Sequence, residues 1–328
     1  MTRFAGVVDQ ALELAIVPSF TRLGYEVRSR LDSWTPLDGY DLTGRVVVVT
    51  GATSGLGLAA AQTLAADGAT VEMVARNEAK ATEVCERLRE AGAPGGADFV
   101  LADTADLDAV RRVAEELAQR HGRVDALVHA AGALDETYAL SPQGIEHTVA
   151  SQVVGPFLLT DLLVPLLREA PKARVLWVSS GGMYAEPLSV DRLEMSPDDY
   201  NGTRAYARAK RAQVTLAEMW SDRLRSDRIA VHAMHPGWAD TPGVRRSLPT
   251  FRRVLGPLLR SPAEGADTIV WLTADDGPPV ETTGRFWIDR RPRPVHRLPS
   301  TRRSDTPTER QRLWDWCAER ASWTSSPH

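Results

Sequence analysis

The sequence predicts an α/β protein: a doubly wound, parallel sheet in one domain, with an extension at each end. From Arg45 onward, short apolar runs alternate with longer helix-forming runs, which is the pattern of βαβ units. The first apolar run enters a glycine-rich turn that leads into a helix-forming stretch. The sequence shows no internal repeat and no second fold.

The expected elements follow in regular order. Strands are predicted at 45–50, 70–75, 98–102, 124–130, 174–179, 229–234 and 284–288. Helices are predicted near 56–67, 78–91, 107–120, 144–168, 204–225 and 262–274. Right-handed crossovers bring the carboxyl ends of parallel strands to one edge of the sheet, so a ligand is expected at that edge.

Residues 1–40 form an N-terminal extension. The runs Phe4–Leu14 and Pro18–Leu31 have the spacing of two short amphipathic helices, whose apolar faces need a partner. Two alternatives stay open: docking on this domain or on a second subunit of a homo-oligomer, or contact with a membrane surface. The segment is a poor signal peptide because Asp9 and Glu13 are acidic.

Residues 291–328 form a C-terminal extension beyond the domain of residues 41–290. The stretch 290–303 holds six arginines among Pro, Ser and Thr, which predicts an irregular, solvated basic loop. The run 307–323 predicts a helix that places on one side Leu313, Trp316, Cys317 and Ala321.

Length and composition exclude several classes of protein. A chain of 328 residues can bury a sizeable core, and a formal net charge of −4 gives no reason to expect nucleic acid as a partner. The two cysteines, Cys85 and Cys317, have no metal-binding or redox spacing, which fits a reduced, cytoplasmic setting. No apolar run approaches the roughly 20 residues that a membrane span needs.

The glycine-rich turn indicates a dinucleotide site. It runs from Gly51 to Gly57, after the apolar run Arg45–Val49 and before the helix former Leu58–Ala66. Glycines let the backbone approach a pyrophosphate, and the N-terminus of the following helix favours its negative charge. The sheet is therefore expected to be of the Rossmann type.

Tyr206 and Lys210 project from the same face of a predicted helix, one turn apart. A phenol has a reference pKa near 10, and a nearby ammonium favours the phenolate. The pair could therefore carry a proton near neutral pH. Alone, this pair is weak evidence for catalysis, because a Tyr and a Lys at this spacing usually lie on an ordinary helix surface.

Together these residues resemble the short-chain dehydrogenase/reductase family in its compact form, over about residues 44–290. The family's TGxxxGxG motif is matched by Gly51, Gly55 and Gly57, and its YxxxK motif by Tyr206 and Lys210. The strand-end serine and the PG turn of the family are matched by Ser180 and by Pro236-Gly237. The runs Val178–Met183 and Met234–Arg245 resemble in particular one branch, that of family member twelve.

The resemblance implies a role for each matched position. It assigns catalysis to Ser180, Tyr206, Lys210 and Gln152. It assigns cofactor binding to Gly51, Thr53, Ser54, Gly55, Leu56, Gly57, Arg76, Asp103, Thr104, Ala130, Ala131, Gly132, Tyr206, Lys210, Pro236, Gly237, Trp238 and Thr241. No metal is needed.

Arg76 bears on the choice of cofactor. Members that prefer NAD place an acid for the ribose 2′-hydroxyl after the second strand, where this chain has Ala75. Arg76 follows and could pair with a 2′-phosphate, which favours NADP and leaves NAD open. Asp103 resembles the family residue that meets the adenine amino group.

Two positions depart from the family pattern. His129 and Ala130 stand where the family has two asparagines, and His129 is expected to be structural. Gln152 stands where the family has the asparagine that helps hold a proton-relaying water. Its main-chain carbonyl is kept, but the extra methylene displaces the amide, so we expect an altered relay.

The resemblance implies reversible hydride transfer between NADP(H) and the carbonyl or alcohol carbon of a small molecule. Tyr206 would donate the proton, Ser180 would hold the oxygen, and Lys210 would anchor the ribose. The rim comprises the insert 184–203, Trp238 and a mobile lid over 242–260, whose Trp, Met, Leu and Pro residues suggest an apolar substrate.

The alternative is a catalytically weak nucleotide-binding protein that acts through partners. Gln152, His129 and the two extensions favour it, while the intact serine, tyrosine and lysine oppose it. An acyl-enzyme hydrolase is disfavoured because no His–Asp relay accompanies Ser180.

Overall fold

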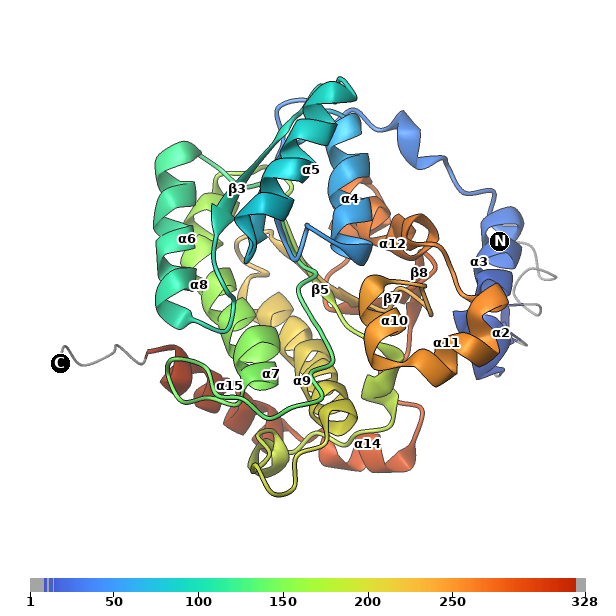
Figure 1. The fold of residues 1–328 in the computed structure, drawn as a ribbon, viewed down its shortest axis with the longest axis vertical. Helices are drawn as coiled ribbons and strands as arrows, with labels where there is room; N and C mark the ends of the chain where they lie inside the picture. Colours follow the sequence, from blue (N-terminus) through green and yellow to red (C-terminus); the bar gives the residue numbers. More distant parts are fainter. Residues whose placement is uncertain (1–8, 11, 14, 323–328) are drawn as a thin grey trace.

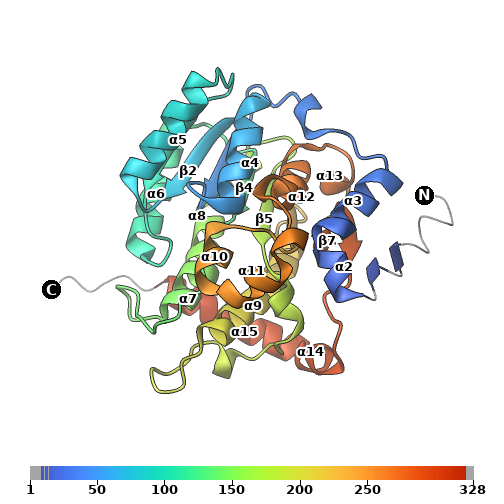
Figure 2. The ribbon, with the colours of Figure 1, turned by 45° about the vertical axis from the view of Figure 1, so that its right-hand side comes forward.

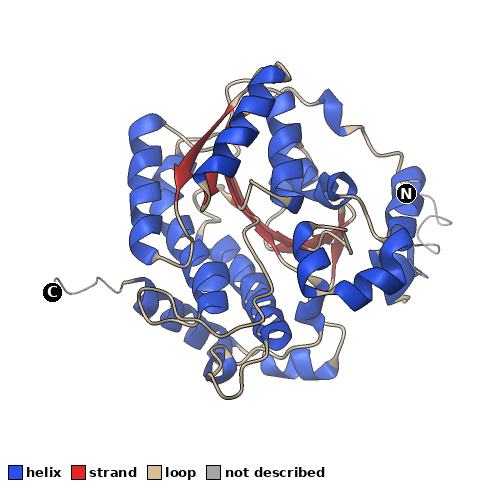
Figure 3. Cartoon of the chain, viewed as in Figure 1, coloured by secondary structure: helices blue, strands red, loops and turns tan. Residues whose placement is uncertain are grey.

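The computed structural model describes residues 9–10, 12–13 and 15–322. A mixed sheet runs through the molecule and carries helices on both faces (Figures 1 and 3). Its strands are β1 (Val46–Thr50), β2 (Thr70–Ala75), β3 (Ala97–Leu101), β4 (Ala126–His129), β5 (Arg174–Val178), β6 (Ala230–Met234), β7 (Arg285–Ile288) and β8 (Arg291–Arg293).

The strand order is β3-β2-β1-β4-β5-β6-β7-β8. The first seven strands pair in parallel, and β8 pairs antiparallel with β7. The order reverses between β1 and β4, which is where a doubly wound sheet opens a crevice for its ligand. The predicted Rossmann-type class is confirmed.

Alternating side chains of β1 explain the two helix layers. Val47 and Val49 belong to one hydrophobic cluster, and Val48 belongs to the other. The first cluster joins the sheet to α4 (Gly55–Ala66), α5 (Glu78–Glu90) and α12 (Pro262–Ala274). The second joins it to α6 (Leu107–Arg120), α8 (Gly155–Arg168), α9 (Gly202–Arg223) and α15 (Pro307–Ala321).

Capping side chains fix where several helices begin. Asn77 and Asn201 each accept a hydrogen bond from the backbone N–H three residues later, at the starts of α5 and α9. Ser261 and Glu264 form a reciprocal capping box at the start of α12. The start of α9 matters most for function because this helix carries Tyr206 and Lys210.

The predicted strands and core helices are all present, with ends that differ by at most three residues. The predicted helix 144–168 is composite: α7 (His147–Val149), a π-helical segment (Ala150–Val154) and then α8. The predicted lid 242–260 contains α10 (Pro242–Ser247), α11 (Pro249–Leu255) and a 3₁₀ turn (Gly256–Leu258).

The N-terminal extension packs on the main domain beside β7, β8 and α11 (Figures 1 and 2). The predicted second helix is divided into α2 (Ile16–Phe20) and α3 (Arg22–Leu31). Of the predicted helix Phe4–Leu14, residues 9, 10, 12 and 13 are helical and the rest lies outside the described residues. Docking on this domain was one of the alternatives left open by the sequence, and the extension makes these contacts.

The prediction of a solvated basic loop over 290–303 was wrong. This stretch contains β8 and α14 (Pro299–Ser304). Arg291 and Arg293 have side chains 10% and 8% exposed and pair with Asp9, at 2.5 and 2.6 Å respectively. These two arginines are buried because each pairs with an acid. That acid lies about 280 residues earlier in the chain, in the N-terminal extension.

The C-terminal helix covers α8 and α9. Leu313, Cys317 and Ala321 are buried as predicted. Trp314, which the prediction left out, meets Phe157 and Trp220 with ring centroids 4.8 and 4.7 Å apart. The extension therefore completes the core on this face of the sheet.

One helical stretch, His147–Arg168, is long and apolar enough to cross a membrane, contrary to the prediction that no such run exists. In the structure 72% of its apolar window is buried inside the protein. Its apolar character is thus accounted for by packing against the sheet, α6 and α15.

Candidate active site

The glycine turn after β1 packs tightly against neighbouring backbone, at the edge of the sheet where the cofactor is expected. Gly51 has a φ of +71°, and a Cβ there would come within 2.7 Å of the Ala131 backbone. A Cβ on Gly57 would lie 2.4 Å from the Gly51 carbonyl oxygen. The turn opens the twelve-residue helix α4, whose free N–H groups face the same edge. Thr53 and Ser54 lie in the turn, and Leu56 packs on α12 beside Gly265.

The other positions assigned to the cofactor lie along the same edge. Ala130, Ala131 and Gly132 follow β4, and Thr50 Oγ1 accepts a hydrogen bond from Ala131 N at 3.1 Å. Thr241 caps α10 and lies over the glycine turn, 3.4 Å from where a Cβ of Gly55 would be. Pro236, Gly237 and Trp238 follow β6.

Ser180, Tyr206 and Lys210 come together where β5 ends against α9. Ser180 lies near enough to Tyr206 for its hydroxyl to lower the pKa of the phenol. Lys210 Nζ lies 5.2 Å from the centre of the Tyr206 ring and donates to the Val178 carbonyl at 3.0 Å. Ser179 Oγ donates to the Lys210 carbonyl at 2.9 Å, which is a structural role.

The pKa shifts of Tyr206 and Lys210 differ from those expected from the sequence. Burial raises the pKa of Tyr206, and the Ser180 hydroxyl opposes that rise only in part. Burial also lowers the pKa of Lys210, to about 7. The two groups share a site that is poor in water, so desolvation of each charged form outweighs their attraction in the protein without cofactor.

Gln213 is a site residue that the sequence argument missed. Its Oε1 accepts from Lys210 Nζ at 3.1 Å, and its Nε2 donates to the main-chain oxygen of Gln152 at 2.7 Å. The side chain is fully buried and connects the lysine to the carbonyl expected to serve the proton relay. Its spacing of three residues from Lys210 on α9 was the available signal.

Gln152 lies in the π-helical segment between α7 and α8, a local irregularity common at functional sites. Its Nε2 donates to the Ala133 carbonyl at 2.7 Å. Its Oε1 is buried and has no hydrogen-bond partner. A Cβ on Gly132 would lie 3.1 Å from this oxygen and 3.0 Å from Lys210 Nζ, so the side chain faces the catalytic group.

The adenine end of the expected cofactor site holds a charged cluster. Arg76 is 61% exposed and donates to Asp103 at 3.4 Å. The carboxylates of Asp103 and Asp135, 3.9 and 3.1 Å from its ring nitrogens, raise the pKa of His147 to about 9. Burial alone would raise the pKa of Asp103, but the nearby His147, a hydrogen bond from Ala105 N and the charge of Arg76 hold it near 2. Thr104, next to Asp103, donates to a main-chain oxygen of the π-helical segment.

His129 has the surroundings of a structural residue. Its Nε2 meets Thr160 Oγ1 at 2.8 Å, and that hydroxyl donates to the Pro156 carbonyl. The ring nitrogen must therefore be the donor. Burial lowers the pKa of His129 to about 3, so it stays neutral against Trp177. The altered strand end is thus tied to α8.

The rim takes its shape from the insert and the segment 242–260. Asp198 and Asp199 of the insert are exposed. Trp238 is partly exposed and meets Phe251 of α11 edge-on at 5.1 Å. Among the described parts of the chain, no group of three or more His, Cys, Asp or Glu side chains could hold a metal ion.

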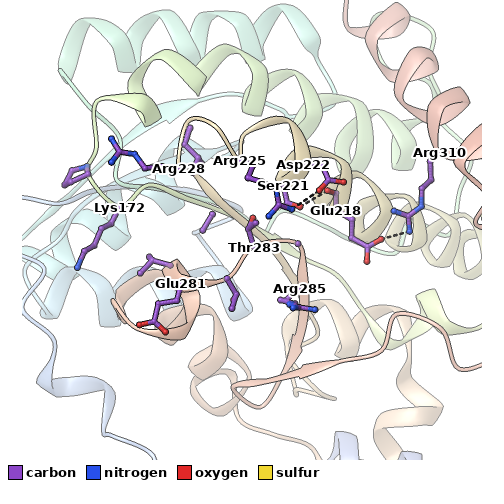
Figure 4. Close-up of a pocket in the computed structure, with 16 residues that line it drawn as sticks. Lys172, Glu218, Ser221, Asp222, Arg225, Arg228, Glu281, Thr283, Arg285 and Arg310 are labelled. Carbon is purple, nitrogen blue, oxygen red and sulfur yellow. Dashed lines mark hydrogen bonds and ion pairs between the residues drawn. The ribbon is translucent and has the colours of Figure 1, made fainter.

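A large hollow of about 820 Å³ lies elsewhere, near the first residues of β6 and β7 (Figure 4). Charged side chains dominate its wall, among them Arg225, Arg228 and Arg285. It is on the opposite edge of the sheet from the glycine turn. The chemistry of the site above therefore does not involve it.

The glycine turn, the Ser–Tyr–Lys group and the parallel sheet define a class of protein. The family model for short chain dehydrogenase matches residues 45–250, more than half of the chain. This chain belongs to that family of NAD(P)-dependent oxidoreductases.

Individual relatives show which branch of the family this chain resembles. The chain is 37% identical over 298 residues to human dehydrogenase/reductase SDR family member 12, covering 90% of this chain and 91% of that protein. It is 33% identical over 263 residues to mouse retinol dehydrogenase 14, covering 75% and 78% of the two chains. The predicted likeness to the branch of family member twelve is confirmed.

Solved structures agree on the fold. A short chain dehydrogenase from Salmonella enterica serovar Typhi superposes with a TM-score of 0.64 at 26% identity, covering 79% of this chain and all of that one. An Escherichia coli CFT073 protein complexed with NADPH gives a TM-score of 0.63 at 26% identity, covering 78% and 100%.

Proposed function

We propose that this protein is an NADP(H)-preferring oxidoreductase that interconverts a carbonyl and an alcohol on an apolar small molecule. The observation that carries the proposal is the group of Ser180, Tyr206 and Lys210 beside a glycine turn that a dinucleotide fits. The NADPH-bound structural neighbour and the retinol dehydrogenase relative support it.

The cofactor preference rests on the adenine end of the site. No acid stands at position 75 to bind a ribose 2′-hydroxyl, and the exposed Arg76 is free to turn from Asp103 to a 2′-phosphate. The glycine turn and the N-terminus of α4 would hold the pyrophosphate. The buried, unpartnered Oε1 of Gln152 marks the nicotinamide end as a place that accepts a further donor.

In the direction of reduction, the bound cofactor supplies a hydride to the carbonyl carbon. Ser180 holds the carbonyl oxygen by a hydrogen bond, and Tyr206 donates its phenolic proton to it. Lys210 then favours the phenolate, and Tyr206 regains a proton from solvent water before the next turnover. Gln213 contributes by holding the Lys210 ammonium and the Gln152 carbonyl in place through its two hydrogen bonds. In oxidation the same steps run backwards.

The test is NADPH and NADH consumption with ketones, aldehydes, retinoids and steroids, run on the wild type and Tyr206→Phe. The phenylalanine keeps the ring packing and removes the proton donor. We expect turnover to fall at least about 10²-fold while NADPH affinity changes little. Near-normal turnover in the variant would rule out Tyr206 as the acid.

The altered relay position favours a second candidate, a nucleotide-binding protein with little turnover that acts through partners. Its signature in the same experiment is tight NADPH binding by calorimetry with no consumption for any compound. A substrate with turnover sensitive to Tyr206→Phe excludes it.

A further inference from the structure

Phe20, in the N-terminal extension, lies against two segments of the active site. Its ring meets His235 edge-on with centroids 4.5 Å apart, and Trp238 in the same way at 5.7 Å. A Cβ added to Gly181, next to the catalytic serine, would come within 3.0 Å of the ring. The Phe20 carbonyl accepts a hydrogen bond from Trp238 N at 2.7 Å. A residue outside the matched family region thus touches the segments after β5 and β6.

A buried ionic cluster holds the backbone on both sides of this phenylalanine. Arg260 donates to the Ser19 carbonyl at 3.2 Å and to the Thr21 carbonyl at 3.3 Å. Arg28 donates to the same Ser19 carbonyl at 3.0 Å. Both guanidiniums pair with Asp289 at 2.6 Å, and all three charged side chains are at most 1% exposed. The position of the phenylalanine is therefore strongly constrained.

The row of rings continues from the buried interior to the rim. Phe20 is 2% exposed, so it has no surface to offer a substrate. Trp238 and Phe251 are partly exposed, and their rings meet at 5.1 Å with planes 87° apart. Edge-to-face packing of this kind fixes ring orientation, so the first ring sets the angle of the second.

We propose that Trp238 and Phe251 form an apolar wall of the substrate pocket and that Phe20 is a positioning residue that holds Trp238 from behind. This inference rests on the proposed carbonyl chemistry and adds a preference for the part of the substrate that does not react. The favoured substrate carries an extended alkyl or ring substituent beside its carbonyl carbon. Such a substituent gains binding free energy by covering the two rings.

A series of straight-chain aldehydes from butanal to decanal, with NADPH, tests the wall. In the wild type kcat/KM rises with chain length. Trp238→Ala flattens the rise, and Phe20→Leu lowers kcat/KM for decanal about tenfold, mainly through KM, with about a twofold effect on butanal. The double variant is no worse than Trp238→Ala alone, because Phe20 acts through the tryptophan.

Phe157→Leu is the matched control. Phe157 is 4% exposed and, like Phe20, packs against two aromatic rings, here those of Trp220 and Trp314 beside the C-terminal helix. It should lower the melting temperature about as much as Phe20→Leu and keep the dependence on chain length. Equal losses for every aldehyde in Phe20→Leu, or additive losses in the double variant, would overturn the proposal.

Hydrogen exchange without substrate separates this inference from the proposed function. Phe20→Leu should speed amide exchange in residues 181–184 and 236–240, and leave β1 to β3 unchanged. If no carbonyl compound is turned over by the wild type, the proposed function fails, and so does the substrate wall. Exchange then still decides the positioning role: no change, or a uniform change across the sheet, refutes it.

Discussion

Lys210 illustrates how a single buried residue can differ from its motif. Its Nζ donates to the Val178 carbonyl and to Gln213, and among the residues that the structure describes no carboxylate forms an ion pair with it. Burial accordingly holds its pKa near 7. A bound, negatively charged dinucleotide would favour the ammonium form, so cofactor binding and the charge of this lysine should be coupled.

Arg76→Ala tests the cofactor preference at the same scale. The arginine has one partner, Asp103, on a largely exposed contact that contributes little to stability. A charge-assisted contact with a 2′-phosphate is worth about 1.5–3 kcal/mol. NADP(H) affinity should therefore fall about tenfold or more while NAD(H) affinity stays nearly unchanged, as measured by calorimetry. Equal losses for both cofactors, or a wild-type preference for NAD, would contradict the assignment.

Gln152→Asn tests the altered relay. The shorter amide would lose its 2.7 Å contact with the Ala133 carbonyl in a buried site. We expect turnover to fall, and the free energy of unfolding to fall by about 1 kcal/mol. Steady-state kinetics and a thermal melt measure both. Higher turnover with unchanged cofactor binding would instead mean that the family's asparagine restores a relay that limits the rate.

At the scale of elements, the two extensions form one unit with β7 and β8. Arg28 on α3 pairs with Asp289 after β7, while Arg291 and Arg293 of β8 pair with Asp9. This ionic cluster therefore joins charged residues of both signs in the N-terminal extension to Asp289 and to the arginines of β8.

Arg28→Met should be strongly destabilising because it removes one of the two guanidiniums that neutralise the buried Asp289 and one of the donors to the Ser19 carbonyl. Breaking a buried ion pair from one side costs about 3–5 kcal/mol. A thermal or urea melt measures the loss. Arg30→Met, on the same helix, is the control: its side chain is 80% exposed and its contact with Glu26 is 3.7 Å long. Similar stabilities for the two variants would show that the buried pair contributes nothing.

Features that depend on residues close together in the sequence could be predicted, and features that depend on distant partners could not. The strands, the core helices and the location of Tyr206 and Lys210 on one helix depend on residues a few positions apart, so the structure agrees with their prediction. Gln213 could have been predicted from its spacing of three residues from Lys210, but no motif marks it. The burial of Arg291 and Arg293 and the placement of Phe20 could not be predicted, because each depends on a partner more than 200 residues away.

At the scale of the whole molecule, buried histidines should set the response to acid. Burial lowers the pKa values of His129 and His235 to about 3 and that of His232 to about 4, each from an ordinary 6.5. Between about pH 6.5 and 4 the unfolded chain binds protons at these positions and the folded chain does not. Their contribution to stability is therefore present above pH 6.5 and is lost as the pH falls.

Melting temperatures from pH 8 to pH 4 measure this effect, and the decline should begin near pH 6.5. His147 has the opposite sign, because its folded pKa is raised to about 9. Its contribution is complete below pH 6.5 and is lost as the pH rises toward 9, so His147→Gln should reduce stability at pH 6 and hardly at pH 10. A flat profile in the wild type between pH 8 and 5 would contradict the scheme.

The pairing of Arg28 with Asp289 also has a consequence for biosynthesis. The ribosome makes Phe20 and Arg28 long before Arg260, Asp289 and β8. Until those later residues are made, the ionic cluster cannot hold the phenylalanine against the segments after β5 and β6. A nascent chain that has not yet reached Asp289 would therefore lack the packing behind its catalytic pocket.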